Sequence, residues 1–155
     1  MKIWFCRSKT VVGRLIQLAT FSKWNHVALQ VGGIVYEVDM KGGVRMVRLK
    51  DFLAMWSETQ CLDVYVRDQA ATIRWLNQQL GKPYDFMAIL ALPFRTTWQH
   101  PHKWFCSELV AKALAVGGLR EFAIEKFRIT PRDLWILAPW YSDKDRERLK
   151  PRYGV

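Results

Sequence analysis

The residues best suited to chemistry in this 155-residue sequence are a cysteine and a histidine that lie far apart in the chain. Cys106 follows a polar stretch and begins a segment, residues 105–116, whose apolar side chains have helical spacing. A thiol at a helix N-terminus lies at the positive end of the helix dipole, which favours the reactive thiolate. A nearby base would complete the activation of this nucleophile. The alternative interpretation of Cys106 is a small buried apolar side chain without a chemical role.

His26 is the candidate base, and it lies in the segment with the clearest β pattern. Apolar and polar residues alternate over residues 25–31, which places His26 on the face opposite the valine and leucine side chains. Gly32 and Gly33 predict a two-residue turn, and residues 34–39 predict the return strand of a hairpin. A solvated sheet face with polar residues is the alternative interpretation of this pattern.

Two carboxylates share the predicted face of His26. With a two-residue turn, Asp39 lies directly opposite His26 and Glu37 lies diagonal to it, so both side chains are within reach of the imidazole. A carboxylate that holds the imidazole in one tautomer would be the third member of a nucleophile–base–orienter triad. Either carboxylate fits this role. A register slip of one residue would move both to the other face.

The remaining histidines and cysteines have weaker patterns. His100 and His102 flank a proline and would have to join His26 to bind a metal, but no acidic spacing supports such a site, so we expect a solvated loop and no metal. Cys6 and Cys61 lie in apolar, strand-like runs, which predicts structural burial. Three cysteines without a CxxC pair do not form a disulfide framework or a zinc site. No organic cofactor is expected.

The loop that contains Tyr84 has two interpretations. Tyr84 would donate a hydrogen bond to an oxyanion if the loop lies near Cys106. Alternatively, Tyr84 and Asp85 only form a turn, with Asp85 as the N-cap of the short apolar segment that follows. The sequence does not separate these two roles.

The predicted strands and helices that position these side chains indicate one α+β domain over residues 1–155. No repeat or low-complexity linker divides the chain, and a charged, flexible tail is expected from about residue 142. A second glycine pair before residue 44 extends the hairpin into an antiparallel meander. The predicted strands are residues 2–6, 25–31, 34–39, 44–49 and 61–66, and the predicted helices are residues 10–21, 51–56, 68–80, 86–92, 105–116 and a short one from 130.

The charge of the chain is strongly basic and unevenly distributed. There are 24 Lys and Arg residues against 14 Asp and Glu, a net charge of +10, and most of the excess lies in the first 50 residues. This favours an anionic partner. The N-terminus lacks the pattern of a signal peptide and no apolar run is long enough to span a bilayer, so we expect a protein that is cytoplasmic as synthesised, unless other machinery delivers it elsewhere.

The order of four motifs, NHVAL, VYEVDMKGGV, GKPYDF and WFCSELVAKAL, resembles a known family. It is similar to the circularly permuted branch of the NlpC-type papain-like cysteine hydrolases, which includes the YiiX-like proteins and has lecithin:retinol acyltransferase as a distant relative. The resemblance covers about residues 20–118. It implies a papain-like α+β fold, with the nucleophile helix packed against an antiparallel sheet. It also implies Cys106 as nucleophile, His26 as base, Glu37 as orienter and Tyr84 near the site, with an acyl-thioester intermediate.

Three functions are compatible with these observations. The leading hypothesis is a cysteine amidase or peptidase that acts on peptidoglycan-type peptides. The second is a lipid-directed acyltransferase or thioesterase, in which residues 86–92 and the tryptophans line an acyl site. The third is a non-enzymatic basic module that holds a membrane or nucleic acid through residues 94–104. Because the charge is concentrated around the strands of the predicted site, an anionic substrate or surface, such as a cell-wall peptide or a lipid headgroup, is favoured over nucleic acid.

Overall fold

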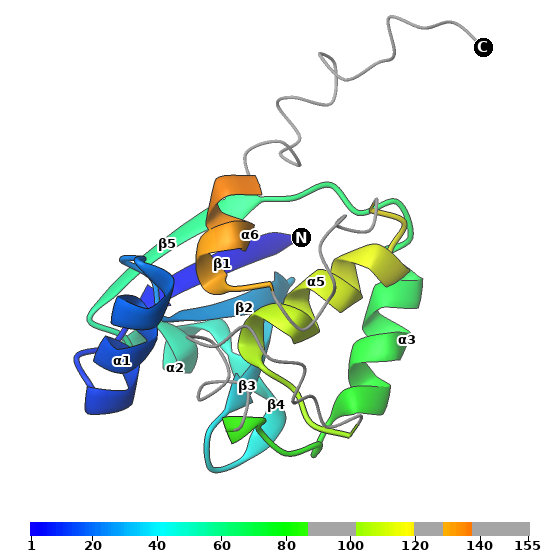
Figure 1. The fold of residues 1–155 in the computed structure, drawn as a ribbon. Helices are drawn as coiled ribbons and strands as arrows, with labels where there is room; N and C mark the ends of the chain where they lie inside the picture. The colour runs from blue at the N-terminus through cyan, green and yellow to red at the C-terminus, as the bar shows by residue number, and fades with distance from the viewer. Residues whose placement is uncertain (87–101, 120–128, 138–155) are drawn as a thin grey trace, which may run out of the picture.

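A five-stranded antiparallel sheet forms the centre of the protein (Figure 1). The computed structural model describes residues 1–86, 102–119 and 129–137. The order of strands in the sheet is β4-β3-β2-β1-β5. The strands are β1 (Lys2–Arg7), β2 (His26–Val31), β3 (Ile34–Asp39), β4 (Gly43–Arg48) and β5 (Glu58–Asp63), and the described helices are α1 (Val11–Thr20), α2 (Leu49–Ala54), α3 (Gln69–Gln79), α5 (Cys106–Val116) and α6 (Pro131–Leu137).

The two faces of the sheet are covered by different helices, because side chains alternate along each strand. On one face, Val27 and Leu29 of β2 belong to the large core that also contains buried residues of α1, α3, α5 and α6. On the other face, Ala28 and Val35 pack with Phe52 of α2 in a smaller cluster. The cysteine-bearing helix α5 lies against β2 and β3 (Figure 1). The α+β architecture predicted from the sequence is therefore confirmed.

The β2–β3 hairpin has the predicted two-residue turn. Its pairs are Leu29–Tyr36, Gln30–Val35 and Val31–Ile34. Gly32 has a φ of 58°, a left-handed conformation that glycine adopts readily. In the described strands, the pairing does not continue to His26 opposite Asp39 as we had predicted. At that end His26 pairs with Cys6 of β1, and Asp39 pairs with Gly43 of β4.

Glycine at the β3–β4 turn allows a close approach between two distant segments. Gly43 has a φ of 66°, and a Cβ atom there would lie 2.2 Å from the carbonyl oxygen of Lys82. Val44 N donates to Lys82 O at 2.8 Å, and Gly81 N donates to Val44 O at 2.8 Å. These bonds hold the loop that contains Tyr84 against the start of β4.

The same loop is tied to the start of α5. Tyr84 and Trp104 form an isolated parallel bridge. Asp85 N donates to Trp104 O at 3.0 Å, and Trp104 N donates to Pro83 O at 3.1 Å. The meander, the Tyr84 loop and the N-terminus of α5 are thus connected through backbone hydrogen bonds.

Some predicted elements differ from the observed ones. The last strand is Glu58–Asp63 and not residues 61–66, because it pairs along β1 from Lys2–Asp63 to Arg7–Glu58. The short helix predicted at residues 51–56 is Leu49–Ala54. Residues 87–92 of the predicted helix 86–92, most of the segment 94–104 and the tail from residue 142 lie outside the described residues. Within the part of the chain that is described, no helix has the length and apolarity needed to cross a membrane.

Helix α1 begins as predicted and buries only some of its apolar side chains. Thr10 is its N-cap and accepts a hydrogen bond from Gly13 N at 3.1 Å. The apolar residues Val11, Val12, Leu15, Ile16 and Ala19 recur at helical spacing in its sequence. In the structure Ile16 is buried, whereas Val11 and Leu15 are exposed. The helix has more apolar side chains than its contact with the sheet can cover.

Candidate active site

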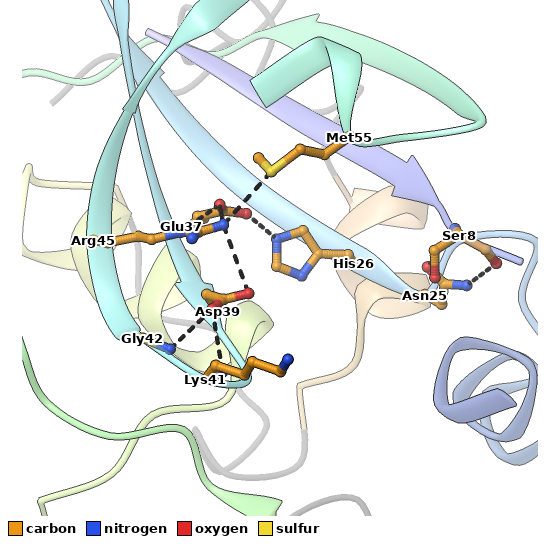
Figure 2. Close-up of polar contacts among 9 residues, drawn as sticks. All are labelled: Ser8, Asn25, His26, Glu37, Asp39, Lys41, Gly42, Arg45 and Met55. Carbon is orange, nitrogen blue, oxygen red and sulfur yellow. Dashed lines mark hydrogen bonds and ion pairs between the residues drawn. The ribbon is translucent and has the colours of Figure 1, made fainter. Parts of the chain in front are cut away.

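His26 is the first residue of β2, and its imidazole is buried with an exposed fraction of 8 %. Its Nε2 atom is 3.0 Å from Oε2 of Glu37, which Figure 2 shows from the neighbouring strand β3. The indole of Trp56, just after α2, stacks on the imidazole at a centroid distance of 4.6 Å and an interplanar angle of 15°. One ring nitrogen and one ring face of His26 are therefore held in place, which limits the rotation of the ring.

Glu37 uses its two carboxylate oxygens for different partners. Oε2 accepts from His26, and Oε1 accepts from Arg45 Nε at 3.0 Å and Arg45 Nη2 at 2.7 Å (Figure 2). The side chain is 2 % exposed. Burial alone would raise the pKa of Glu37, but hydrogen bonds and charge from His26 and Arg45 outweigh burial and lower it. Glu37 is therefore an ionised carboxylate between two cationic groups.

Asp39, the second carboxylate that the sequence placed beside His26, has other partners. Its Oδ2 atom accepts from Lys41 N at 3.1 Å and Gly42 N at 2.9 Å in the β3–β4 turn. Its Oδ1 atom lies 3.6 Å from Arg45 Nη2. Figure 2 shows Asp39 at the turn, while Glu37 reaches the imidazole. The carboxylate in hydrogen-bond contact with His26 is thus Glu37.

Cys106 is the first residue of α5, as its position in the sequence predicted, and it is buried. Cys106 is one of the groups that raise the pKa of His26. Burial by itself lowers the pKa of His26, but hydrogen bonds and charge from Cys106 and Glu37 outweigh burial and raise it from 6.5 to about 9. At neutral pH His26 is therefore an imidazolium, stabilised by Cys106 and Glu37.

Tyr84 lies beside the same end of α5. Its buried ring contacts Phe105 at a centroid distance of 5.9 Å and Phe86 at 5.1 Å. Burial raises the pKa of Tyr84, and the nearby charges of Cys106, Asp85 and Glu108 raise it further. The phenol is therefore a neutral group that is able to donate a hydrogen bond.

Two residues that contact the triad candidates were missed in the sequence. Arg45 pairs with Glu37 across β3 and β4. This pairing was predictable from the Gly42–Gly43 turn, because the turn sets the register of the β3–β4 hairpin. Trp56 has no comparable signal, since its stacking on His26 depends on how α2 packs against the sheet.

Glu108 is part of the CSEL motif and has a structural contact. Its Oε2 atom accepts from Phe105 N at 3.2 Å, so it caps the helix that begins at Cys106. Burial raises the pKa of Glu108 to about 7, and the neighbouring Asp85 also raises it. This contact helps to fix where the helix starts and thereby the position of the thiol.

The other two cysteines are free thiols. Cys6 lies opposite His26 in the β1–β2 pair and is fully buried, so the prediction of structural burial is correct for it. Burial is the main cause that raises the pKa of Cys6, followed by the charges of Glu37 and Cys106. Cys61 on β5 is only partly buried.

In the papain-like class, a helix with a cysteine at its N-terminus packs on an antiparallel sheet next to a histidine. This protein has that arrangement, and its histidine precedes the cysteine in the chain. Residues 2–131 match the family described as permuted papain-like amidase enzymes, YaeF/YiiX, C92 family. The chain belongs to this family. Membership confirms the resemblance to the permuted, YiiX-like proteins and the papain-like fold, and the family itself is described as one of amidase enzymes.

One similar solved structure is that of the metalloprotein yiiX from Escherichia coli O157:H7. It has a TM-score of 0.58 and 26 % sequence identity, and the match covers 77 % of this chain and 66 % of that chain. The chain thus spans slightly less than two thirds of the length of that protein. No curated protein compared with the chain matches it.

The description of yiiX as a metalloprotein raises the question of whether this chain has a comparable set of ligands. Over residues 1–86, 102–119 and 129–137, no three His, Cys, Asp or Glu side chains are grouped so that they could hold a metal ion. His102 is within these ranges and His100 lies outside them. The described side chains therefore do not fit a metal site.

Proposed function

We propose that this protein is a cysteine amidase that hydrolyses amide bonds with Cys106 as nucleophile, His26 as general acid and base, and Glu37 as the residue that orients His26. The observation that carries this proposal is the buried imidazole, which has Glu37 at 3.0 Å on one side and a pKa raised by Cys106. A base between a thiol and an orienting carboxylate is the arrangement needed for acyl transfer.

The first half of the reaction forms a covalent intermediate. The sulfur of Cys106, as thiolate, attacks the carbonyl carbon, and the carbonyl oxygen becomes an oxyanion. Backbone N–H groups at the start of α5 are free of helical partners and would stabilise this charge, with the phenol of Tyr84 as a second donor. The C–N bond then breaks, His26 gives its proton to the leaving nitrogen, and an acyl-thioester on Cys106 remains.

The second half consumes one water molecule. His26, now neutral, removes a proton from water as the hydroxide oxygen attacks the thioester carbonyl. The C–S bond breaks, the acid leaves and the Cys106 thiolate is restored next to the protonated imidazole. Glu37 remains ionised throughout, because Arg45 and His26 both favour its charged form.

We propose peptidoglycan-type peptides as the substrate class. The net charge of +10 supports this choice, since cell-wall polymers are anionic and a basic protein concentrates on them. Incubation of the purified protein with cell-wall peptides, followed by detection of new amino groups, tests this substrate. Absence of release, together with hydrolysis of simple amides, would reject the substrate and leave the mechanism intact.

A thiol-directed acylating probe tests the mechanism itself. Mass spectrometry should locate the acyl group on Cys106, and Cys106→Ala should abolish both labelling and hydrolysis. Cys61→Ala is the matched control, because Cys61 is a free cysteine on β5 outside the contacts described above. Equal labelling of wild type and Cys106→Ala would refute the proposal.

A lipid-directed acyltransferase is a second candidate, and the exposed apolar side chains of α1 favour it. It would use the same acyl-thioester, with a lipid as acyl donor. Incubation with phospholipid and mass spectrometry of Cys106 distinguishes the two, because only a lipid-directed enzyme would carry a fatty acyl group.

A further inference from the structure

Helix α1 presents an apolar face to solvent. Val11, Leu15, Leu18 and Phe21 recur at helical spacing and are exposed by 76 %, 55 %, 70 % and 81 %. We call these four residues the α1 apolar face. Single exposed apolar residues are common, but four on one face of a short helix indicate a binding surface.

The surroundings of the α1 apolar face are basic. The first 36 residues contain five Lys and Arg and no Asp or Glu. Arg14 lies among the four residues of the face, one turn after Val11, and Lys9 precedes the helix. Among the ion pairs of the described residues none involves Lys9 or Arg14, whereas Lys23 and Arg7 pair with Glu58. Two cations next to the face therefore remain available to an anionic partner.

Hydrogen bonds tie both ends of the α1 segment to the rest of the protein. Ser8 N donates to Asn25 Oδ1 at 3.1 Å, and Asn25 Nδ2 donates to Ser8 O at 3.0 Å, which joins the two ends of the α1 segment. Arg132 Nη1 of α6 donates to Thr20 O at 3.5 Å, which joins the last residue of α1 to another element. The apolar face is thus displayed by a fixed helix.

Phe21 strengthens this interpretation. It ends α1 with a φ of 48°, the left-handed conformation that glycine or asparagine adopts most easily. A phenylalanine there gains nothing from burial, because most of its ring is in solvent. Its presence is readily explained if the ring is buried in a partner.

We infer that the α1 apolar face and the adjacent Lys9 and Arg14 bind the surface of an anionic lipid bilayer. An amphipathic helix with basic flanks lies in the membrane interface, where its apolar side chains enter the acyl region and its cations meet lipid headgroups. A second copy of the chain fits poorly, since it would bring two strongly basic surfaces together. Residues 21–25 connect α1 directly to His26, so docking would place the start of β2 near the membrane.

The test is co-sedimentation of the full-length protein with vesicles. We expect binding to an equimolar mixture of phosphatidylcholine and phosphatidylglycerol, weak binding to phosphatidylcholine alone, and a loss of binding as salt is raised. Leu15→Ser with Leu18→Ser should weaken binding by about 100-fold, because each buried leucine contributes roughly a factor of ten. Lys9→Glu with Arg14→Glu should weaken it by at least about 25-fold, at about a factor of five for each cation.

Two controls separate this inference from folding and from catalysis. Met46→Ser removes an exposed apolar side chain of β4 and should leave binding unchanged. Cys106→Ala should bind as wild type does, since the inference does not depend on the proposed activity. Thermal unfolding of each variant checks that the fold is intact.

Three results would overturn the inference. The first is equal binding of wild type and the leucine variant to the anionic vesicles. The second is a wild-type dimer in solution that the leucine variant lacks, which would assign the face to a second copy. The third is a large loss of thermal stability in the leucine variant, which would show that the face is covered by this chain itself.

Discussion

Replacing Glu37 by Gln should lower the pKa of His26 substantially. The substitution keeps the size of the side chain but removes the negative charge that lies 3.0 Å from Nε2. Burial of the imidazole, which by itself lowers its pKa, remains unchanged. Cys106 also remains, so part of the increase should persist.

The size of the effect follows from the burial of both groups. An opposite charge within about 4–6 Å shifts a pKa by about 1–3 units, and a pair in which both side chains are buried lies in the upper part of that range. We therefore expect the pKa of His26 to fall from about 9 by roughly 2 units. This corresponds to about 3 kcal/mol in the stability of the imidazolium.

NMR titration of the imidazole signals measures this pKa. The chain has three histidines, and the signal that disappears in His26→Gln identifies the relevant one. Asp39→Asn is the matched control, because it removes a carboxylate of the same strand that contacts Lys41 and Gly42 backbone groups and not His26. An unchanged pKa in Glu37→Gln, or an equal decrease in Asp39→Asn, would refute the assignment of Glu37.

Other perturbations test the remaining parts of the site. The raised pKa of His26 means that its proton stabilises the fold fully below pH 6.5 and that this contribution, up to about 3 kcal/mol, is lost as the pH rises through about 9. Urea unfolding at these two pH values should show the decrease in wild type and a smaller one in His26→Gln. Gly43→Ala should lower the free energy of unfolding by more than about 1 kcal/mol, because its Cβ would collide with Lys82 O at a positive φ, whereas Gly33→Ala, with open space around it, should not. Tyr84→Phe should lower kcat by about 10-fold or more with little change in KM if the phenol stabilises the oxyanion, and an unchanged kcat would exclude that role.

The parts of the fold that depend on neighbouring residues in the chain were predictable. A two-residue glycine turn sets the register of the β2–β3 hairpin, and the observed Leu29–Tyr36 pair has that register. The start of α5 at Cys106 follows from the apolar periodicity of the residues after it. These features are local, so they do not depend on the position of any other element. The order along the chain of the four motifs that contain His26, Glu37, Tyr84 and Cys106 was sufficient for the resemblance to the permuted family.

Tertiary structure decided which of two similar side chains contacts His26. Alternation along β3 placed Glu37 and Asp39 on one face and left both open as partners of His26. In the folded protein the β3–β4 turn engages Asp39, and Arg45 holds the second oxygen of Glu37. These partners come from the β3–β4 turn and from β4, whose pairing the local pattern of β2 and β3 does not specify.

The same distinction applies to α1 and α2. The periodicity of α1 predicts a helix correctly, but it has apolar residues on more than one side, and only packing against the sheet decided that Ile16 is buried and Leu15 is exposed. Trp56 reaches His26 because α2 covers the second face of the sheet. The sequence by itself determined which elements form and which residues are able to react. Contacts between distant elements decided which carboxylate serves the histidine and which apolar face remains in solvent, because burial of a side chain depends on what packs against it.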